Sequence, residues 1–552
     1  MQRKLGELTK QRYDLAIIGG GINGAATARE AALRGLKVAL VDVGDFASGT
    51  SSRSSKLIHG GLRYLEQFGF KLVRESRTER RTLVALAPHL ARSLPFVLPI
   101  YRGDPYYPLK IRVGLTIYDL LGNLGRNDRH RMLSREDALR LIPGLQAEGL
   151  RAGAVYYDSE TDDARLTLEM ILAAAEHGAC VANYAEIRAL ETSTAGTAHE
   201  VVSAEVEDRL TGQRHELAAR FWVNAAGPWV DQVRALLPGF DGTKTVRLTR
   251  GTHVILPAVD PDHALFAAIP PGDRIFLLLP WHGRALLGTT DTDFDGDPAS
   301  VQPDPADIDY LLAAVNRVLR QPLTARDVLG SFAGLRALVI EPGRSPSQNT
   351  REHRFHEESG LRNFISICGG KLTTARALAE KLVDRVAGRL GAAVTAGQVS
   401  RTTPLPGGDT GPFEEFVRKA TDGAAQEFGV PARTAERIVR TYGRRWRHVL
   451  EPIREQPALL KPLGGNPTLL AAEVQFAVRN EMAFNVEDFL VRRSGLNWLA
   501  ACSLGEAAPA VAEIFAGELG WPPERRRASL DAFARCACVA ASPQASPERC
   551  KN

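Results

Sequence analysis

A glycine-rich turn near the start of the chain constrains its fold more than any other feature. The motif Gly19-x-Gly21-x-x-Gly24 separates an apolar run, residues 13–19, from an amphipathic segment, residues 22–34. These patterns predict a short buried strand followed by a helix. In such a junction the first glycine allows a tight turn and the second a close approach to a ligand. The third allows close packing of helix on strand.

A second strand and an acidic residue complete the unit. Residues 37–41 (KVALV) predict a buried parallel strand, and Asp42 follows it. Asp42 lies 18 residues after Gly24, close to the roughly 20-residue spacing of a carboxylate that binds a ribose hydroxyl. The helix N-terminus would face a pyrophosphate. The unit therefore predicts an adenine-dinucleotide site, and the alternative is a glycine-rich turn in another α/β fold.

The polar run at residues 48–56 (SGTSSRSSK) bears on which dinucleotide binds. Its hydroxyl groups suit a pyrophosphate and a ribityl chain, although such a run is also typical of an ordinary polar turn. The predicted cofactor-binding residues of this run are Thr50, Ser51, Ser54, Ser55 and Lys56.

A second strand–glycine–helix junction occurs more than 300 residues later. Residues 363–368 predict a strand, Gly369 and Gly370 follow, and residues 372–390 predict a helix. The positive end of that helix suits the N1/O2 edge of a reduced flavin, where negative charge develops. The two junctions together favour FAD over NAD, with Gly370, Leu372 and Thr373 at the cofactor.

Length and composition limit the remaining possibilities. A chain of 552 residues exceeds one hydrophobic core and predicts several lobes. The net charge of +5 is small and its arginines are dispersed, so no nucleic-acid partner is expected. The six cysteines have no metal-site spacing and predict free thiols and no metal. Without a signal sequence or a spanning segment, the expected location is the cytoplasm or a membrane surface.

The pattern changes at residues 403–412, a Pro/Gly-rich segment typical of a linker. Before it, helical and strand patterns alternate, and residues 200–206 and 216–223 predict neighbouring strands. After it, the pattern is almost entirely helical. We therefore predict one domain over residues 1–403 and a helical domain over residues 404–552.

Several longer segments resemble the FAD-dependent glycerol-3-phosphate dehydrogenases, of the D-amino-acid-oxidase-like flavoprotein superfamily. The resemblance spans nearly the whole chain and is carried by IGGGINGA (18–25), TSSRSSKLIHGGLRYLE (50–66), FWVNAAGPWVD (221–231), CGGKLTTARALAE (368–380) and AEVQFAVRNEMAFNVEDFLVRRSGL (472–496). The chain departs from the family pattern at Ala26, Glu30, Ala337 and Ala375. The first two are expected on an outer helix, and Ala375 is expected to loosen packing near the flavin.

The resemblance implies an α/β fold in which a Rossmann-like FAD-binding domain is interleaved with an antiparallel-sheet substrate domain. An all-α C-terminal domain follows. The resemblance also adds Leu57, His59 and Gly227 to the predicted cofactor-binding residues.

The implied reaction is oxidation of sn-glycerol 3-phosphate to dihydroxyacetone phosphate by hydride transfer to flavin N5. The resemblance places Arg63, Tyr64, Arg336, Arg351 and Lys371 around the substrate, and arginine suits phosphate because its planar fork binds two oxygens. Arg336 and Lys371 would stabilise developing negative charge.

Two histidines are candidates for removing the substrate hydroxyl proton. An imidazole with its ordinary pKa near 6.5 suits a base at neutral pH. We expect His253 to be the base, and the alternative is a strand histidine held by packing. His59 is the second candidate, and it could equally anchor its loop against the flavin.

The resemblance also implies an enzyme bound peripherally to the inner face of the cell membrane and donating electrons to a quinone. Residues 106–121 are the predicted contact with anionic lipid, and a core helix or the Arg-rich region 433–454 are alternatives. A homodimer is left open. Rival functions are an oxidase of the same superfamily that uses O₂, a non-catalytic FAD-binding protein and an RNA-modifying flavoprotein.

Overall fold

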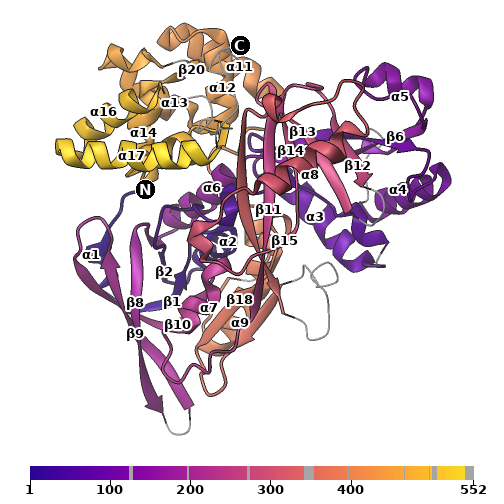
Figure 1. Cartoon of the computed structure of the whole chain (residues 1–552). Helices are drawn as coiled ribbons and strands as arrows, with labels where there is room; N and C mark the ends of the chain where they lie inside the picture. The colour runs from indigo at the N-terminus through magenta and orange to yellow at the C-terminus, as the bar shows by residue number, and fades with distance from the viewer. Residues whose placement is uncertain are drawn as a thin grey trace.

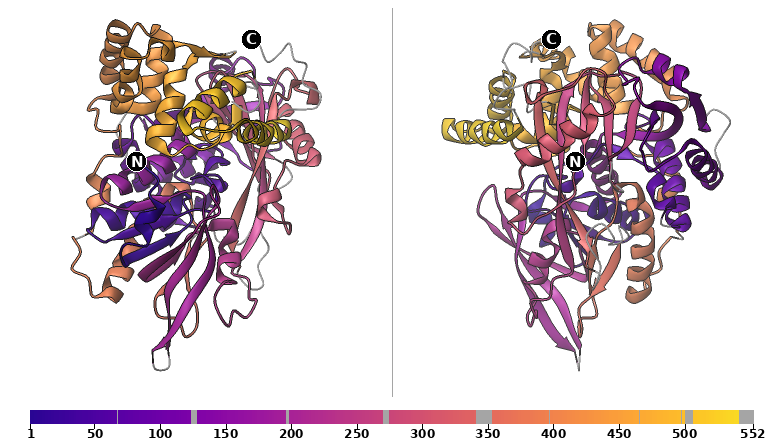
Figure 2. Two further views of the ribbon diagram at one scale, coloured as in Figure 1. Left: turned by 90° about the vertical axis from the view of Figure 1, so that its left-hand side faces the viewer. Right: turned by 45° about the vertical axis from the view of Figure 1, so that its right-hand side comes forward.

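The structure is a computed structural model of the chain. It describes residues 1–66, 68–122, 128–195, 198–269, 274–340, 353–395, 397–464, 466–496, 498–499 and 506–540. Figure 1 shows one sheet-containing lobe beneath a group of C-terminal helices, drawn in orange and yellow, and a second sheet-containing lobe to the right of them, and Figure 2 shows the same arrangement from two other sides.

A parallel sheet forms the first lobe. Its parallel strands lie in the order β18 (Phe364–Cys368), β10 (Arg214–Asn224), β1 (Tyr13–Ile18), β2 (Val38–Val41) and β7 (Cys180–Ala182). Three of these strands end beside one another, because Ile18 pairs with Asn224 and Asn224 pairs with Ser366. The turns that follow β18, β10 and β1 therefore meet at one edge of the sheet.

Antiparallel strands extend this sheet beside β18 and β10. β17 (Arg354–Glu357) pairs with β18. The hairpin of β8 (Ala185–Ala195) and β9 (Ala198–Asp208) pairs through β9 with the first half of β10. The predicted strands at residues 200–206 and 216–223 are thus confirmed as antiparallel neighbours.

Helix α2 (Ile22–Leu33) follows the first glycine turn and is enclosed by other helices. α6 (Asp163–Glu176) and α9 (Ala375–Leu390) pack against it. Ala26 and Glu30 are consequently buried, with Glu30 fully inaccessible to solvent. The expectation that these two positions lie on an outer helix is wrong, because the helices that cover α2 come from distant parts of the sequence.

A second, ten-stranded sheet forms the other lobe, and its strand pairs are antiparallel apart from β12 with β4. Its strands are β3 (Leu57–Ile58), β4 (Ala91–Tyr101), β5 (Arg131–Ser134), β6 (Leu150–Thr161), β11 (Val246–Pro257), β12 (Ala264–Ile269), β13 (Arg274–Trp281), β14 (Arg284–Gly288), β15 (Thr292–Asp293) and β16 (Gly330–Val339). These strands come from both sides of β7–β10 in the sequence. The interleaved α/β fold is therefore confirmed.

Helices complete the second lobe. α8 (Pro305–Asn316) and α5 (Arg135–Leu141) pack with one hydrophobic cluster of the sheet. α3 (Phe70–Leu86) and α4 (Pro108–Gly122) pack together near β6. None of the helices in the described ranges has the length and apolar character needed to cross a bilayer.

The C-terminal part is helical in its described residues, apart from a short ribbon of β19 (Pro462–Leu463) and β20 (Asn466–Leu470). Its longer helices are α11 (Phe413–Phe428), α12 (Ala432–Tyr442), α14 (Ala471–Glu481), α16 (Ala508–Leu519) and α17 (Pro523–Ala540).

Buried ion pairs join these helices to the first lobe. Arg165 of α6 donates to Glu481 of α14 at 2.7 Å, and both side chains are fully buried. Asp45, in the loop after β2, accepts hydrogen bonds from Arg492 at 2.6 Å and from Arg493 at 2.5 and 2.7 Å. Charges buried this way are tolerated only when they are paired. The helical part is thus fixed to the loop that follows Asp42.

Candidate active site

A cavity of about 1290 Å³ lies between the two lobes. The glycine turns after β1, β10 and β18 form one wall, contributing Gly19, Gly21, Gly227 and Gly370. The first and last turns touch, because the Asn23 Nδ2 donates to the Gly369 carbonyl at 3.2 Å. The second sheet forms the opposite wall. Two junctions that are distant in sequence therefore build one site.

Glycine is required in both turns by close contacts. A Cβ atom on Gly24 would lie 1.9 Å from the Gly19 carbonyl oxygen, so helix α2 can approach the turn only without a side chain there. Gly370 has a φ of +102°, and a Cβ on it would lie 2.9 Å from the Asn23 amide. These turns bring the backbone at two helix starts to the cavity wall, the end of a helix that favours an anionic ligand.

Asp42 ends β2 and organises the first turn. Its Oδ2 accepts from the Gly20 N–H at 2.6 Å and its Oδ1 from the Gly44 N–H at 2.8 Å. Burial raises the pKa of this carboxyl to about 6. Asp42 lines the cavity, and each carboxylate oxygen keeps a further lone pair for a ribose hydroxyl.

The polar run after β2 wraps one side of the cavity, which Thr50, Ser51, Ser54 and Ser55 all line. Ser51 Oγ accepts from the Ile22 N–H at 2.9 Å, and Thr50 donates to the Leu335 carbonyl at 2.6 Å. The loop is thereby bound to α2 on one side and to the second sheet on the other.

Lys56 does not line the cavity, contrary to the prediction that it contacts the cofactor. Its side chain is 1% exposed, and its amine donates to Asp163 at 2.5 Å and to the Ser52 carbonyl at 2.6 Å. A buried ammonium needs such a partner, and Asp163 also accepts from the Ser54 hydroxyl at 2.7 Å. Lys56 therefore fixes the loop from behind.

The remaining predicted cofactor residues, Leu57, His59, Leu372 and Thr373, line the cavity. The Thr373 hydroxyl oxygen accepts from the His59 N–H at 3.2 Å, which joins the His59 loop to the second glycine turn.

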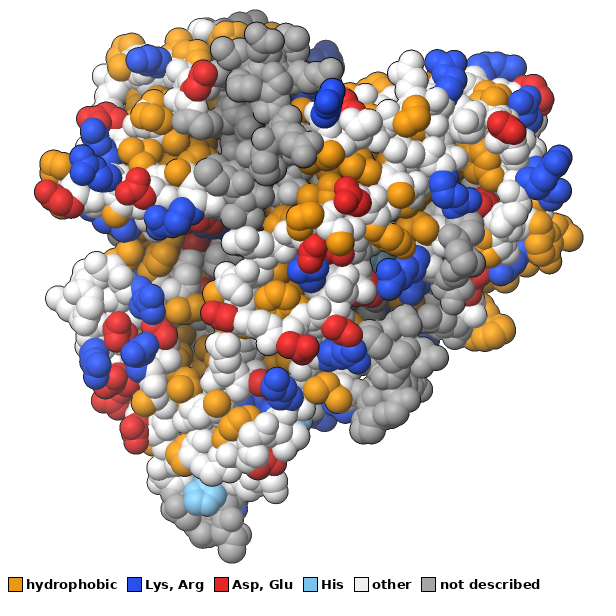
Figure 3. Space-filling model, viewed as in Figure 1, with side chains coloured by type: hydrophobic (Ala, Val, Ile, Leu, Met, Phe, Trp, Pro, Cys, Tyr) orange, Lys and Arg blue, Asp and Glu red, His pale blue; other side chains and the backbone are white. Residues whose placement is uncertain are grey.

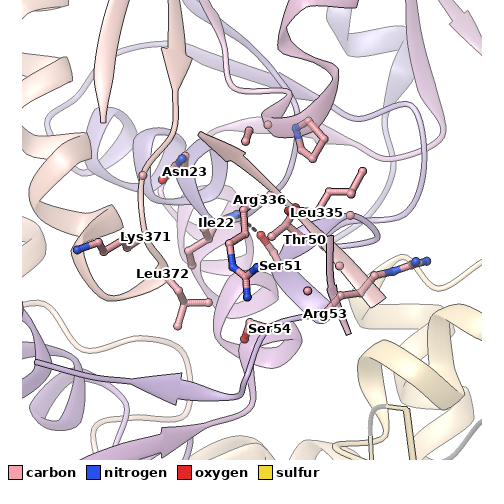
Figure 4. Close-up of a pocket in the computed structure, with 18 of the residues that line it drawn as sticks. Ile22, Asn23, Thr50, Ser51, Arg53, Ser54, Leu335, Arg336, Lys371 and Leu372 are labelled. Carbon is pink, nitrogen blue, oxygen red and sulfur yellow. Dashed lines mark hydrogen bonds between the residues drawn. The ribbon is translucent and has the colours of Figure 1, made fainter. Parts of the chain in front are cut away.

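Arginine and lysine approach the cavity from different segments. Arg336 of β16 donates to the Thr290 carbonyl at 3.0 Å, to Asp291 at 3.2 Å and to Thr289 at 3.1 Å. The Lys371 amine lies 3.8 Å from the centre of the Tyr64 ring. Figure 4 shows these two cations on different sides of the start of α2.

Arg63 and Tyr64, in the turn η2 (Leu62–Leu65), also line the cavity. Arg351 lies outside the described residues, so its predicted substrate contact stays a prediction.

His253 of β11 is a buried part of the cavity wall. Its Nε2 lies 2.9 Å from Ser55 Oγ, and its ring stacks on Phe332 at 4.9 Å between centroids. A Cβ on Gly288 would lie 2.3 Å from the imidazole, so the ring is confined from a second side.

The environment of His253 disfavours its charged form. Burial, followed by the positive charges of Arg336 and Lys56, lowers its pKa to about 3. The expectation of an imidazole with an ordinary pKa is therefore wrong for this site, since it is enclosed and faces two cations.

Several lining residues escaped the sequence prediction. Asn23, Val43, Ala185 and Ile187 all line the cavity. Asn23 belongs to the glycine motif, and Val43 follows Asp42 directly, so both could have been found by position. Ala185 and Ile187 carried no such signal, because their location depends on the path of β8.

Comparisons with known proteins identify the class. Residues 14–385 match the family model described as "FAD dependent oxidoreductase", and residues 398–526 match "C-terminal domain of alpha-glycerophosphate oxidase". Fold and site thus define an FAD-dependent oxidoreductase with an added helical domain.

Individual relatives narrow the class. The chain is 36% identical over 526 residues to the aerobic glycerol-3-phosphate dehydrogenase of Staphylococcus haemolyticus, covering 93% of this chain and 92% of that protein. It is 35% identical over 541 residues to the glycerol-3-phosphate dehydrogenase of Synechocystis, covering 95% and 96%. The solved glycerol-3-phosphate dehydrogenase of Bacillus halodurans, complexed with FAD, matches with a TM-score of 0.77, 32% identity, and coverage of 98% and 97%. The chain belongs to the FAD-dependent glycerol-3-phosphate dehydrogenase family.

Proposed function

We propose that this chain oxidises sn-glycerol 3-phosphate to dihydroxyacetone phosphate at FAD and passes the electrons to a membrane quinone. The observation that carries the proposal is the meeting of Arg63, Arg336 and Lys371 at one cavity, beside the joined glycine turns. A phosphoester with a secondary hydroxyl fits such cations. A site that only stores FAD needs no such set of charges.

The cavity fits FAD in size and in the character of its walls. The turn at Gly19 and Gly21 would hold the pyrophosphate, and Asp42 the ribose. The helix start at Gly370 and Leu372 would face the ring system. When bound, FAD supplies a hydride acceptor at N5.

Arg63 and Arg336 would bind the substrate phosphate. Arg336 is held by three acceptors that fix its guanidinium plane, so little entropy is lost on binding an anion. Lys371, held over Tyr64, would stabilise negative charge that develops on the substrate oxygen. Arg351 remains a proposed additional phosphate ligand.

FAD bound in this cavity would take up the C2 hydrogen of the substrate together with its electron pair. The C2 hydroxyl proton would pass to Nε2 of His253, the atom that the Ser55 hydroxyl contacts at 2.9 Å, and the C2–O bond would become a carbonyl. The lowered pKa of about 3 keeps this imidazole neutral, with a lone pair available, and makes it a weak base while the site holds no anion. A phosphate dianion beside Arg336 would offset part of the positive field that lowers the pKa, and so would strengthen the base when substrate is bound.

The exposed apolar side chains of helix α4 support peripheral membrane binding, which we propose takes place at the inner face of the cell membrane. Its side chains Leu109, Val113 and Leu120 are 64%, 51% and 75% exposed, and Phe68 nearby is 80% exposed. Figure 3 shows apolar surface at the right edge of the molecule, where α4 lies in Figure 1. Isolated apolar residues are common on surfaces, but a patch along one helix is typical of an interface.

This helix is also close to the substrate end of the cavity. α4 packs against η2, which carries Arg63 and Tyr64, and Lys110 pairs with Glu66 at 2.9 Å. By contrast, arginines of the 433–454 region are neutralised by carboxylates, as in Arg440 with Glu414 and Arg447 with Glu427. We therefore favour α4 as the membrane contact.

The test uses the purified holoprotein. Glycerol 3-phosphate added without oxygen is expected to bleach the visible flavin absorbance, and a quinone analogue is expected to restore it faster than O₂ does. Faster recovery with O₂ would favour an oxidase. A preparation that stays oxidised with the substrate, or that is colourless and takes up no FAD, would contradict the proposal.

A further inference from the structure

Three aromatic rings are stacked between the C-terminal part and the cavity. The Trp498 ring lies 5.6 Å from Phe332 at an interplanar angle of 16°, and Phe332 lies 4.9 Å from His253 at 12°. Trp498 is 4% exposed. A residue of the helical C-terminal part is thus separated by one ring from the imidazole in the cavity wall.

Trp498 is also bound to the loop that holds His253. Its Nε1–H donates to the Ser52 carbonyl at 3.0 Å, and the Arg53 guanidinium lies 4.8 Å from its ring centre. Figure 4 shows the Arg53 side chain pointing away from Arg336. The same loop carries Ser55, which is hydrogen-bonded to His253. Two separate paths therefore lead from Trp498 to the imidazole.

On its second side the imidazole lies close to the backbone of Gly288, because a Cβ built there would clash with the ring. The orientation of the ring then depends on Phe332, whose position depends on the ring behind it. Removing the indole would leave a buried cavity that the surrounding side chains only partly fill. Phe332, and with it His253, would gain freedom to tilt.

We propose that Trp498 is a positioning residue for the oxidation, and that it sets the plane of His253 through Phe332 and through the Ser52–Ser55 loop. The inference rests on the proposed function in taking His253 as the group that accepts the substrate proton. It gives the C-terminal helical part a direct role in the chemistry of a cavity formed by the other two lobes.

The test measures flavin reduction by glycerol 3-phosphate in anaerobic stopped-flow experiments on the holoprotein. Trp498→Leu is expected to slow reduction at saturating substrate by roughly 10- to 100-fold, because a misplacement of about 1 Å can cost that much. Substrate affinity should change much less. Trp498→Phe keeps a ring and is expected to retain most of the rate. Trp498→Met, whose unbranched and flexible side chain adapts to an irregular gap, serves if the leucine variant does not fold.

Trp446→Leu is the matched control. Trp446 is a buried tryptophan of the same helical part and contacts Phe428 and Arg447. It is expected to lose stability without slowing reduction. Equal slowing in Trp446→Leu and Trp498→Leu would overturn the proposal, since it would show a general effect of the helical part.

A double-mutant cycle tests the path through His253. If Trp498 acts through the imidazole, Trp498→Leu should add little to the slow rate of His253→Gln. A full additional loss in that background, or an unslowed Trp498→Leu protein, would overturn the inference.

A measurement without substrate tests the inference about Trp498 separately from the proposed function. The ¹⁵N resonances of His253, assigned with His253→Gln, should shift in Trp498→Leu and not in Trp446→Leu, and unchanged resonances would overturn it. A wild-type flavin that glycerol 3-phosphate does not reduce would contradict only the proposed function.

Discussion

At the scale of single residues, Gly251 shows how one missing side chain shapes the site. A Cβ at this position would lie 2.6 Å and 2.8 Å from the two terminal nitrogens of Arg336. Gly251 pairs with Gly334 in the neighbouring strand β16. The bare backbone therefore provides the space that the guanidinium occupies.

Gly251→Ala is expected to displace Arg336 and to weaken binding of glycerol 3-phosphate by about tenfold, roughly 1.4 kcal/mol. Steady-state KM and the substrate Kd from flavin titration would measure the effect. Gly388→Ala in helix α9 is the control, because no atom lies within 4 Å of a Cβ built at Gly388. Unchanged binding in Gly251→Ala would show that Arg336 does not hold the phosphate.

His253 gives a pH prediction that does not depend on activity. Its folded-state pKa of about 3 lies below the roughly 6.5 of an unfolded chain. Between these values the unfolded state binds more protons, so the stability contributed by His253 falls as pH falls from about 6.5 toward 3.

His253→Gln is therefore expected to lose less stability over this acid range than the wild type does. Chemical denaturation at several pH values measures the difference, and His448→Gln, at an exposed histidine, is the control. Parallel curves for wild type and His253→Gln would contradict the lowered pKa.

At the scale of elements, the hydrogen bond from Asn23 to Gly369 joins the starts of α2 and of the segment leading to α9. Asn23→Leu is expected to weaken FAD binding by about tenfold, because one buried hydrogen bond contributes roughly 1 kcal/mol and an unpaired carbonyl costs more. Flavin fluorescence on dilution measures the affinity. Asn316→Leu is the control, since the Asn316 amide, at the last residue of α8, donates to the Leu323 carbonyl. Equal losses in both variants would remove any special role for the turn contact.

Local patterns were sufficient to predict the elements around the cofactor. The strand at 13–19, the helix after Gly21 and the second junction at Gly369 all follow from apolar periodicity and glycine placement. Asp42 was found because its distance from the motif is fixed by one helix and one strand.

Other features could not be predicted, since they depend on what packs from elsewhere. Three features require partners that are distant in sequence: the burial of Glu30, the ion pair that holds Lys56 outside the cavity lining, and the low pKa of His253. The prediction that Arg336 and Lys371 contact the substrate came from the resemblance to a family, and composition and spacing alone did not supply it. Trp498 carried no signal at all, because its partners Phe332 and Ser52 are on other lobes.

At the scale of the whole molecule, the buried pair of Arg165 and Glu481 joins the helical part to α6. Arginines on both sides hold the pKa of the Glu481 carboxyl below its ordinary value, against the effect of burial. Glu481→Gln is expected to cost about 3–5 kcal/mol, because it removes the buried carboxylate that Arg165 and Arg445 share and leaves Arg165 with Glu169 alone.

Denaturant unfolding of the holoprotein measures that cost. Glu414→Gln, which removes the exposed partner of Arg440, is the control and should change stability by less than about 1 kcal/mol. Similar costs for the two variants would contradict the importance of the internal pair.

The exposed face of α4 gives a prediction for membrane association. Leu109→Glu and Leu120→Glu are each expected to reduce co-sedimentation with anionic vesicles and to slow reduction of a membrane quinone, since charge is excluded from the apolar layer. Bleaching of the flavin by glycerol 3-phosphate should be unaffected. Gln213→Glu is the control, because it adds the same charge at an exposed residue outside α4, and it should leave vesicle binding unchanged. Unchanged vesicle binding in both leucine variants would exclude α4 as the contact.

The contact between the two glycine turns has a consequence for biosynthesis. It joins positions 346 residues apart, so a ribosome has to release most of the polypeptide before both halves of the proposed flavin site are present. Large chains of this kind fold in stages. The N-terminal βαβ unit therefore lacks its contact with the second glycine turn while some three hundred further residues are translated. Loading of the prosthetic group is therefore a late event in the life of each molecule, and nascent chains that stop short of Gly369 should leave the ribosome without it.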